Sequence, residues 1–258
     1  MRPRLLLVIS TVAIAFVAGC GSSSAGSKAS GGNPGGANGV QTKSGQQIVA
    51  AAVAATKRQN SFHFVEMAAT TQSSVRIVGD VGSAAGEQHI TVQEGKQSGH
   101  ITVLLAKGMA YFTGDVFGLE GFTGLTKALA TGLAGKWISV PSSNVSFATI
   151  AASLAVKTAA DQLVKLTGKL SRGKTSTQLG HRAVAVKATE KTSTGSLSLT
   201  LYVDTTGAAL PIRVEGTTHA TGGATRSIDA TFTNWGEPVH LSAPQGTEPI
   251  SSVKSLAG

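Results

Sequence analysis

The sequence contains little of what several functional classes require. Cysteine occurs once in 258 residues, which excludes an intrachain disulfide and leaves a lone thiol that needs a reason. Aromatic residues make up 5% of the chain and charged residues 14%. The net charge is +9, but the Lys and Arg are scattered without a run of five, so nucleic acid is not predicted as a partner. The scattered excess predicts at most a weak attraction to anionic lipid headgroups.

The sequence also lacks the patterns that mark catalytic and metal sites. No GxSxG motif occurs, and the 13 acidic residues are too dispersed to indicate a carboxylate pair. The histidines do not stand at metal-ligand spacings, and each is interpreted as a solvated strand residue. We therefore predict that the protein is not an enzyme and uses no metal and no cofactor. The six histidines are His63, His89, His100, His181, His219 and His240.

One stretch does match a phosphate-binding motif. Residues 168–175 read GKLSRGKT, which fits GxxxxGK[ST]. In that loop, backbone amides hold phosphates between a strand and a following helix, whereas here helical spacing precedes the stretch and strand alternation follows it. We therefore predict a basic hairpin turn, in which Lys169, Arg172 and Lys174 could at most contact lipid headgroups.

The N-terminus has the parts of an export signal, and its end resembles a bacterial lipobox. Arg2 and Arg4 precede an apolar stretch at 5–17, shorter than the about 20 residues that a membrane-spanning helix needs. Residues 17–20 then read Val-Ala-Gly-Cys. We predict a signal peptide at residues 1–19. In lipoproteins with this motif the cysteine receives a diacylglycerol thioether, so the resemblance implies that acylated Cys20 attaches the protein to the membrane.

Acylation also explains why a lone cysteine is present. Two or more acyl chains anchor a protein stably, so we expect an exported protein that is lipid-anchored to the outer face of the cell membrane. The alternative is an ordinary signal peptide whose cleavage site happens to precede a cysteine. Residues 20–44 then form a flexible Gly/Ser tether, and residues 45–258 form a single domain.

The periodicity of that domain predicts an α+β fold. Apolar residues follow helical spacing at 46–58, 147–154 and 158–166. The stretch at 115–135 has an apolar helical face interrupted by glycines, so it is predicted to be either a weak helix or a mobile helical loop. Alternation with a period of two, typical of antiparallel strands, runs through the blocks at 62–113 and 184–241. Residues from 244 onward are predicted to be a loose tail.

The second of these blocks carries a family resemblance. Residues 201–204 (LYVD), a turn, and then residues 210–215 (LPIRVE) are similar to a pattern of LolA-like lipoprotein carriers, and residues 232–239 (FTNWGEPV) resemble the closing stretch of such domains. Together with the lipobox, this resembles the actinobacterial LppX/LprG-type lipoproteins. The resemblance implies a curved antiparallel β-sheet, a half-barrel, covered on one face by helices. It also implies an apolar cavity between sheet and helices that accepts acyl chains of glycolipids or phospholipids.

The residues predicted to line such a cavity lie on alternating strands and on the stretch at 115–135. By sequence alone they could equally form an ordinary hydrophobic core. In that case the alternative function is a non-carrier envelope lipoprotein that acts as a protein-binding or assembly module. A carrier would have a lipid or glycolipid ligand and could work with an envelope transport partner. The predicted lining residues are Phe62, Phe64, Ile101, Val103, Leu105, Phe122, Leu125, Leu129, Leu133, Leu197, Leu199, Leu201 and Val203.

Overall fold

The described part of the chain forms one open β-sheet. The structure is a computed structural model that describes residues 36–164, 166, 169–193 and 195–252. Its strands are β1 (Ser61–Ala69), β2 (Ser73–Gly82), β3 (Gly86–Glu94), β4 (Gln97–Ala106), β5 (Met109–Gly114), β6 (Ile138–Val140), β7 (Lys169–Gln178), β8 (His181–Thr192), β9 (Gly195–Asp204), β10 (Pro211–Ala220), β11 (Thr225–Thr233) and β12 (Glu248–Pro249). They follow the order β12-β6-β5-β4-β3-β2-β1-β11-β10-β9-β8-β7, antiparallel except between β12 and β6.

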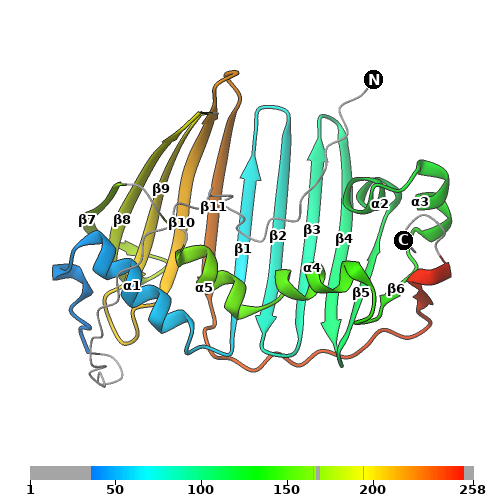
Figure 1. Ribbon diagram of the computed structural model, residues 1–258, viewed down its shortest axis with the longest axis horizontal. Helices are drawn as coiled ribbons and strands as arrows, with labels where there is room; N and C mark the ends of the chain where they lie inside the picture. The colour runs from blue at the N-terminus through cyan, green and yellow to red at the C-terminus, as the bar shows by residue number, and fades with distance from the viewer. Residues whose placement is uncertain (1–35, 165, 167–168, 194, 253–258) are drawn as a thin grey trace.

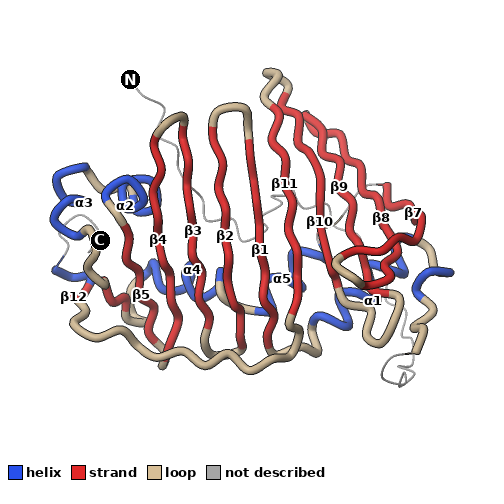
Figure 2. The backbone as a smooth tube through the Cα atoms, turned by 180° about the vertical axis from the view of Figure 1, so that it is seen from behind, coloured by secondary structure: helices blue, strands red, loops and turns tan. Residues whose placement is uncertain are grey.

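Helices cover one face of this curved, unclosed sheet (Figure 1). In the described residues they are α1 (Gly45–Thr56), α2 (Val116–Thr123), α3 (Lys127–Leu133), α4 (Val145–Ser153) and α5 (Val156–Val164), with short 3-10 helices η1 (Val40–Thr42) and η2 (Ile250–Ser252). α1, α5 and α4 lie in a row across the strands, while α2 and α3 lie beside β4 and β5. Seen from behind, the strands lie in front of the helices (Figure 2). The predicted α+β half-barrel covered on one face is therefore confirmed.

α1 begins at a capping box. The Ser44 hydroxyl accepts from the Gln47 backbone N–H at 3.3 Å, and the Ser44 N–H donates to the Gln47 side chain at 3.0 Å, which satisfies two donors that the helix itself cannot. Ile48 and Ala52 are fully buried where α1 packs on α5 and on the β7–β8 end of the sheet. The helix predicted at 46–58 is thus confirmed.

The folded part of the chain begins before residue 45. Val40, in η1, is 1% exposed and belongs to the hydrophobic core. Its backbone N–H donates to the Asn38 side chain. Only the part of the predicted tether that precedes residue 36 lies outside the described residues, together with the signal peptide and Cys20.

The core concentrates the few aromatic residues of the chain. Phe62 packs against Phe64 and Phe232 with ring centroids 5.9 Å apart, and against Trp235 at 4.8 Å. Their strands, β1 and β11, lie side by side in the middle of the sheet order. Offset and edge-on aromatic pairs add about 0.5–1.5 kcal/mol each beyond their buried area. This cluster therefore holds the two blocks of strands together at their junction.

The stretch at 115–135 forms two short helices, α2 and α3, so the alternative of one continuous weak helix is wrong. Gly124 adopts a left-handed conformation with φ 71° and ends α2, and its N–H donates to the Glu120 carbonyl. A new helix, α3, then begins after Thr126. Left-handed backbone is readily available to glycine, and glycine commonly ends helices in this way, so a glycine inside helical spacing is a position at which a break can be predicted.

A direct glycine-to-glycine contact seats α2 on β4. A Cβ atom on Gly99 would lie 2.4 Å from the backbone nitrogen of Gly118. Asp115 fixes the same contact, because one carboxylate oxygen accepts from the Gly118 N–H at 2.7 Å and the other from the His100 N–H at 2.8 Å. The backbone of α2 therefore touches the backbone of β4.

The predicted loose tail and its preceding strand are also wrong. Residues 239–241 are not a strand, although Leu241 and Ala243 pack on Leu104, Ala106 and Tyr111 on the face away from the helices. The chain then adds β12 beside β6, and Ile250 is 4% exposed. Apolar surface at the end of β4 and β5 requires a cover, and the C-terminal segment supplies it.

The phosphate-motif stretch is a strand, so the predicted hairpin turn is wrong. The part from Lys169 onward lies in β7, which continues antiparallel into β8, and Gly168 lies outside the described residues. The register shifts between Arg172 and Thr175, which is a β-bulge. No helix follows this strand, so it does not present the backbone amides of a phosphate-binding loop.

We predict that Gly99→Ala lowers the free energy of unfolding by about 1–3 kcal/mol, because the added methyl group overpacks the contact with Gly118. Gly121→Ala is the matched control, because it lies in α2 with no heavy atom within 4 Å of an added Cβ. We expect the control to stabilise the fold by about 0.5–1 kcal/mol. Urea unfolding of both variants tests this, and equal stability of the two would contradict the contact.

Candidate functional site

An unbroken apolar row crosses nine neighbouring strands on the face that the helices cover. Its members occupy directly paired positions in the antiparallel ladders from β7 to β4. With strands about 4.8 Å apart, the row extends for roughly 40 Å across the sheet. We call it the apolar row; it consists of Leu170, Ala188, Leu199, Gly216, Ile228, Ala68, Val75, Val92 and Gly99.

The apolar row is only partly covered by the protein itself. Ala188, Leu199, Ala68, Val92 and Gly99 are buried, but the other four members remain half-buried. Four members are Ala or Gly, so their side chains project little from the sheet at those positions. Part of this long apolar surface remains in contact with solvent. Covering that part with another apolar group is therefore favourable.

The next paired row toward the helices is fully buried and almost entirely apolar. Leu201, Val214, Ala230, Ile77, Ile90 and Ile101 belong to it. Glu66 lies among them, paired with Ile77 and Ala230, and is 4% exposed. A buried carboxylate requires polar compensation, so this point of the sheet differs chemically from its surroundings.

The helical cover is held mainly by apolar contacts. Ile150, Leu154, Val156 and Ala160 of the α4–α5 region are buried in the interior. The side chain of Gln88, on β3, is fully buried and donates to the Ser153 carbonyl at 2.9 Å, while its own oxygen has no hydrogen-bond partner among the described residues. Apolar contacts are non-directional, so another apolar group of suitable shape can replace them at little cost.

Most of the lining residues predicted from the sequence lie together in one interior. Nine of them are buried in a single hydrophobic cluster, and three more, Leu105, Phe122 and Leu197, are half-buried against it. Leu129 is 39% exposed and lies outside that cluster. It belongs to α3, a separate helix that buries Ala130 and Leu133 instead. The nine are Phe62, Phe64, Ile101, Val103, Leu125, Leu133, Leu199, Leu201 and Val203.

Several residues of this face were missed in the sequence. Val75 and Ile228 belong to stretches whose alternation was visible, and pairing them across strands would have required the register. Ala68, Ala188 and Gly216 carry too little hydrophobic signal to be selected. Gln88 gave no signal, since a polar residue in an alternating strand is assigned to the solvent face.

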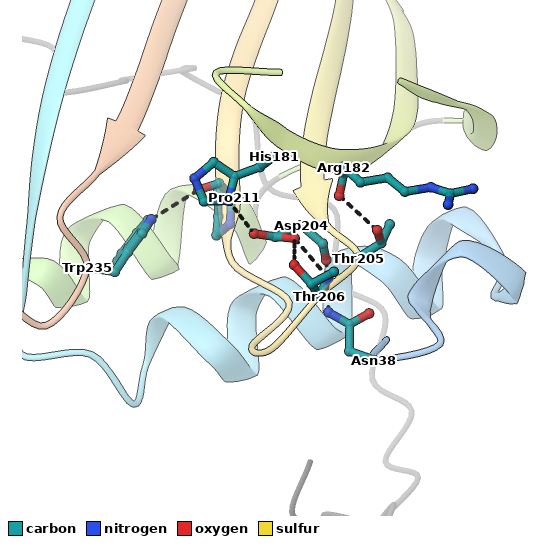
Figure 3. Close-up of polar contacts among 8 residues, drawn as sticks. All are labelled: Asn38, His181, Arg182, Asp204, Thr205, Thr206, Pro211 and Trp235. Atoms are coloured by element: carbon teal, nitrogen blue, oxygen red, sulfur yellow. Dashed lines mark hydrogen bonds and ion pairs between the residues drawn. The ribbon is translucent and has the colours of Figure 1, made fainter. Parts of the chain in front are cut away.

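The sequence motif at residues 201–215 forms a polar corner below β9 and β10 (Figure 3). Asp204 accepts from the Thr206 N–H and hydroxyl, both at 2.8 Å, and contacts His181 at 3.0 Å. The Asn38 side chain donates to the Asp204 carbonyl at 2.9 Å, and the Gly207 N–H donates to the carbonyl of residue 36. The conformation of this turn therefore fixes the point at which the N-terminal segment joins the domain.

A second part of the motif is a charged network on the face away from the helices. Arg213 makes a two-pronged contact with Asp229, at 2.9 and 2.7 Å, and also pairs with Glu215 at 3.1 Å. The Tyr202 hydroxyl donates to Glu215 at 2.6 Å. This hydrogen bond, then desolvation, raises the pKa of Tyr202, and the bond to Asp229 raises the pKa of Arg213. The Arg of the motif is therefore structural and joins β10 to β11.

The residues that the structure describes contain no group of three or more His, Cys, Asp or Glu side chains placed to hold a metal ion. Within the same ranges, no helix is both long and apolar enough to cross a membrane.

The fold is similar to that of two solved mycobacterial proteins. LprF from Mycobacterium bovis superposes with a TM-score of 0.50 and 16% identity, over 78% of this chain and 97% of that one. LppX from Mycobacterium tuberculosis gives a TM-score of 0.45 and 14% identity, over 76% and 99%. No family model and no curated protein sequence matches the chain. The resemblance to lipoproteins of this type is thus confirmed as a likeness of fold.

The Tyr202 network predicts a loss of stability at high pH. The pKa of Tyr202 is raised in the folded state above the value of about 10 of the unfolded chain. The folded state therefore holds the proton more tightly, and the resulting stability is complete below about pH 10 and is lost as the pH rises through the folded pKa. We expect Tyr202→Phe, followed by urea unfolding from pH 8 upward, to lose stability less steeply above about pH 10 than the parent.

Glu215→Gln provides the complementary variant. It removes the carboxylate that is the first cause of the raised pKa, so its stability should also fall less steeply in the same pH window. At neutral pH, loss of the hydrogen bond should cost either variant about 0.5–1.5 kcal/mol. Parallel curves for the parent and Tyr202→Phe above pH 10 would contradict the assignment.

Proposed function

We propose that the protein is a membrane-anchored lipoprotein of the cell envelope that binds acyl chains of a lipid or glycolipid between its sheet and its helices. The observation that supports this most directly is the apolar row. It offers an elongated apolar track in which four of the nine positions are Ala or Gly and which the protein leaves partly exposed. An acyl chain has the matching elongated shape and apolar chemistry.

The energetics of the helical cover favour the same proposal. Burial of apolar surface contributes roughly 25 cal/mol per Å², whether the covering group is a helix or an acyl chain. The Gln88 side chain, on the sheet, donates one hydrogen bond to the Ser153 carbonyl of α4, which contributes about 0.5–1.5 kcal/mol. A ligand that replaces apolar contacts of α4 or α5 therefore has little polar cost to offset.

The polar corner at Asp204 supports the tethered arrangement. It fixes the chain from Asn38 onward to the domain, which leaves the 16 residues 20–35, starting with the proposed acylated Cys20, as the tether. A Gly/Ser-rich segment of that length has a root-mean-square span of about 20–25 Å. The domain would thus remain close to the membrane from which it takes lipid.

We predict that the chain from residue 20 onward, carrying Cys20→Ser and produced in an actinobacterial host, retains lipid that native mass spectrometry detects. The double variant Val75→Gln, Ile228→Gln places two polar amides in the half-exposed part of the apolar row. Each should remove roughly 1 kcal/mol of apolar contact with a ligand, and the two together should weaken binding about thirtyfold.

The matched control is Val78→Gln, Val65→Gln. Val78 lies on the same strand as Val75 but on the opposite face, paired with Val65, and both are half-buried. The control should keep its lipid. Lipid-free parent protein that takes up no added lipid would refute the proposal, and would favour the alternative in which the protein is a binding or assembly module.

Anchoring is tested separately with the full-length chain. We predict that the parent fractionates with membranes after expression and that Cys20→Ser releases it into the soluble fraction, because two or more acyl chains are needed for stable attachment. Mass spectrometry of the parent should show diacylglycerol on Cys20. Membrane association of Cys20→Ser equal to that of the parent would contradict the anchor.

A further inference from the structure

The positive charge of the protein is concentrated at one end of the sheet. Of the 17 Lys and Arg among the described residues, six lie on β7 and β8, with Glu190 as the single acidic residue of those strands. The other eleven are balanced by twelve Asp and Glu elsewhere in the described part. The basic residues that are scattered along the sequence are therefore gathered by the fold.

Three of these lysines share the face of the sheet that points away from the helices. Lys169 is paired with Thr189, which lies between Lys187 and Lys191 on β8. Since side chains alternate along a strand, positions 187, 189 and 191 point to one face. All three lysines are exposed, whereas Ala188, between them in the chain, is buried toward the helices.

No acidic side chain neutralises this group. None of the three lysines makes an ion pair within the described ranges, and Glu190 occupies a position of the opposite face, paired with Leu197. The nearest acid along the Lys187 row is Glu215, two strands away, which Tyr202 and Arg213 already engage.

Hydroxyl groups lie beside the lysines. Thr189 is paired with Ser198, and both are exposed. The surface is therefore an array of ammonium and hydroxyl donors without a competing carboxylate. Phosphate groups of a lipid surface are acceptors with the opposite charge, so the chemistry is complementary.

The N-terminal segment joins the domain at this same end of the sheet. The Arg172 guanidinium, on β7, donates to the Gln41 carbonyl at 3.2 Å, and residue 36 is bonded to the turn between β9 and β10. Figure 1 places the start of the described chain beside β7–β9. A tether with a span of about 20–25 Å keeps this end nearer to the anchor than the β4–β6 end.

We propose that the exposed face of β7–β8, with Lys169, Lys187 and Lys191 at its centre, is the surface by which the domain rests on anionic lipid headgroups of the membrane. The choice of that membrane as the partner rests on the proposed anchoring at Cys20. This contact orients the domain, with the sheet end that bears the tether against the bilayer and the α2–α3 end away from it.

The test uses residues 20–258 with Cys20→Ser, a form that retains all of the contacts described above because they lie within residues 36–252. Its partition is measured by co-sedimentation with vesicles of phosphatidylcholine, alone or mixed with phosphatidylglycerol. We expect binding that requires phosphatidylglycerol and that high salt abolishes. Changing Lys169, Lys187 and Lys191 to Gln should weaken it on the order of 100-fold, at about fivefold for each lysine.

The matched control changes Lys96, Lys107 and Lys127 to Gln. These three lysines are also exposed, and changing them removes the same net charge. They lie elsewhere, on the turns at either end of β4 and on α3. The control should bind as the parent does. Equal weakening of both triple variants would overturn the proposal, because net charge alone would then explain binding. Equal binding of the parent to neutral and to anionic vesicles would also overturn it. Retained lipid is measured on the same proteins by native mass spectrometry, so this proposal and the lipid-binding function can each fail while the other holds.

Discussion

The apolar face of an open sheet must be covered by something other than the sheet, and most of this chain is arranged to meet that constraint. The helices, together with η1, lie over the face that carries the aromatic cluster and the paired apolar rows. The opposite face needs little cover because it is polar, joined by pairs such as Arg213–Asp229 and His63–Asp80. Where apolar residues do reach that face, at the end of β4 and β5, the C-terminal segment packs on them. The same constraint explains why a sheet longer than its helices retains a half-exposed apolar row.

Strands with clear alternation could be predicted because the burial of one face dictates their sequence directly. β9 is an example, with Leu199, Leu201 and Val203 buried and polar residues between them. The failures have local physical causes. Helical spacing across residues 122–133 concealed the left-handed Gly124 that divides two helices. β7 lacked alternation because it is an edge strand with a bulge and mostly exposed side chains, so its sequence is not constrained by a core.

The candidate site was predictable only in part, because it depends on register. Leu199 and Val103 could be selected as large apolar residues on alternating strands, and the fold places both in the interior. The apolar row joins residues that are up to about 160 positions apart, such as Ala68 and Ile228, and nothing in one sequence specifies that pairing. Small members such as Ala188 contribute to the site because they leave neighbouring apolar surface of the sheet uncovered. Their own weak hydrophobicity gives no sign of this in the sequence pattern. The gathering of the lysines on β7–β8 is likewise a property of the strand pairing.

The polar corner at Asp204 also has a mechanical consequence. The chain that arrives from the N-terminus is bonded to the turn between β9 and β10 before it reaches Ser44 and α1. A force applied along that chain therefore enters two paired strands, whose ladder shares the load among many hydrogen bonds. It bypasses the helix that follows, which apolar contacts hold in place. Movements of whatever carries the N-terminus can stretch the connection without lifting α1 from the sheet.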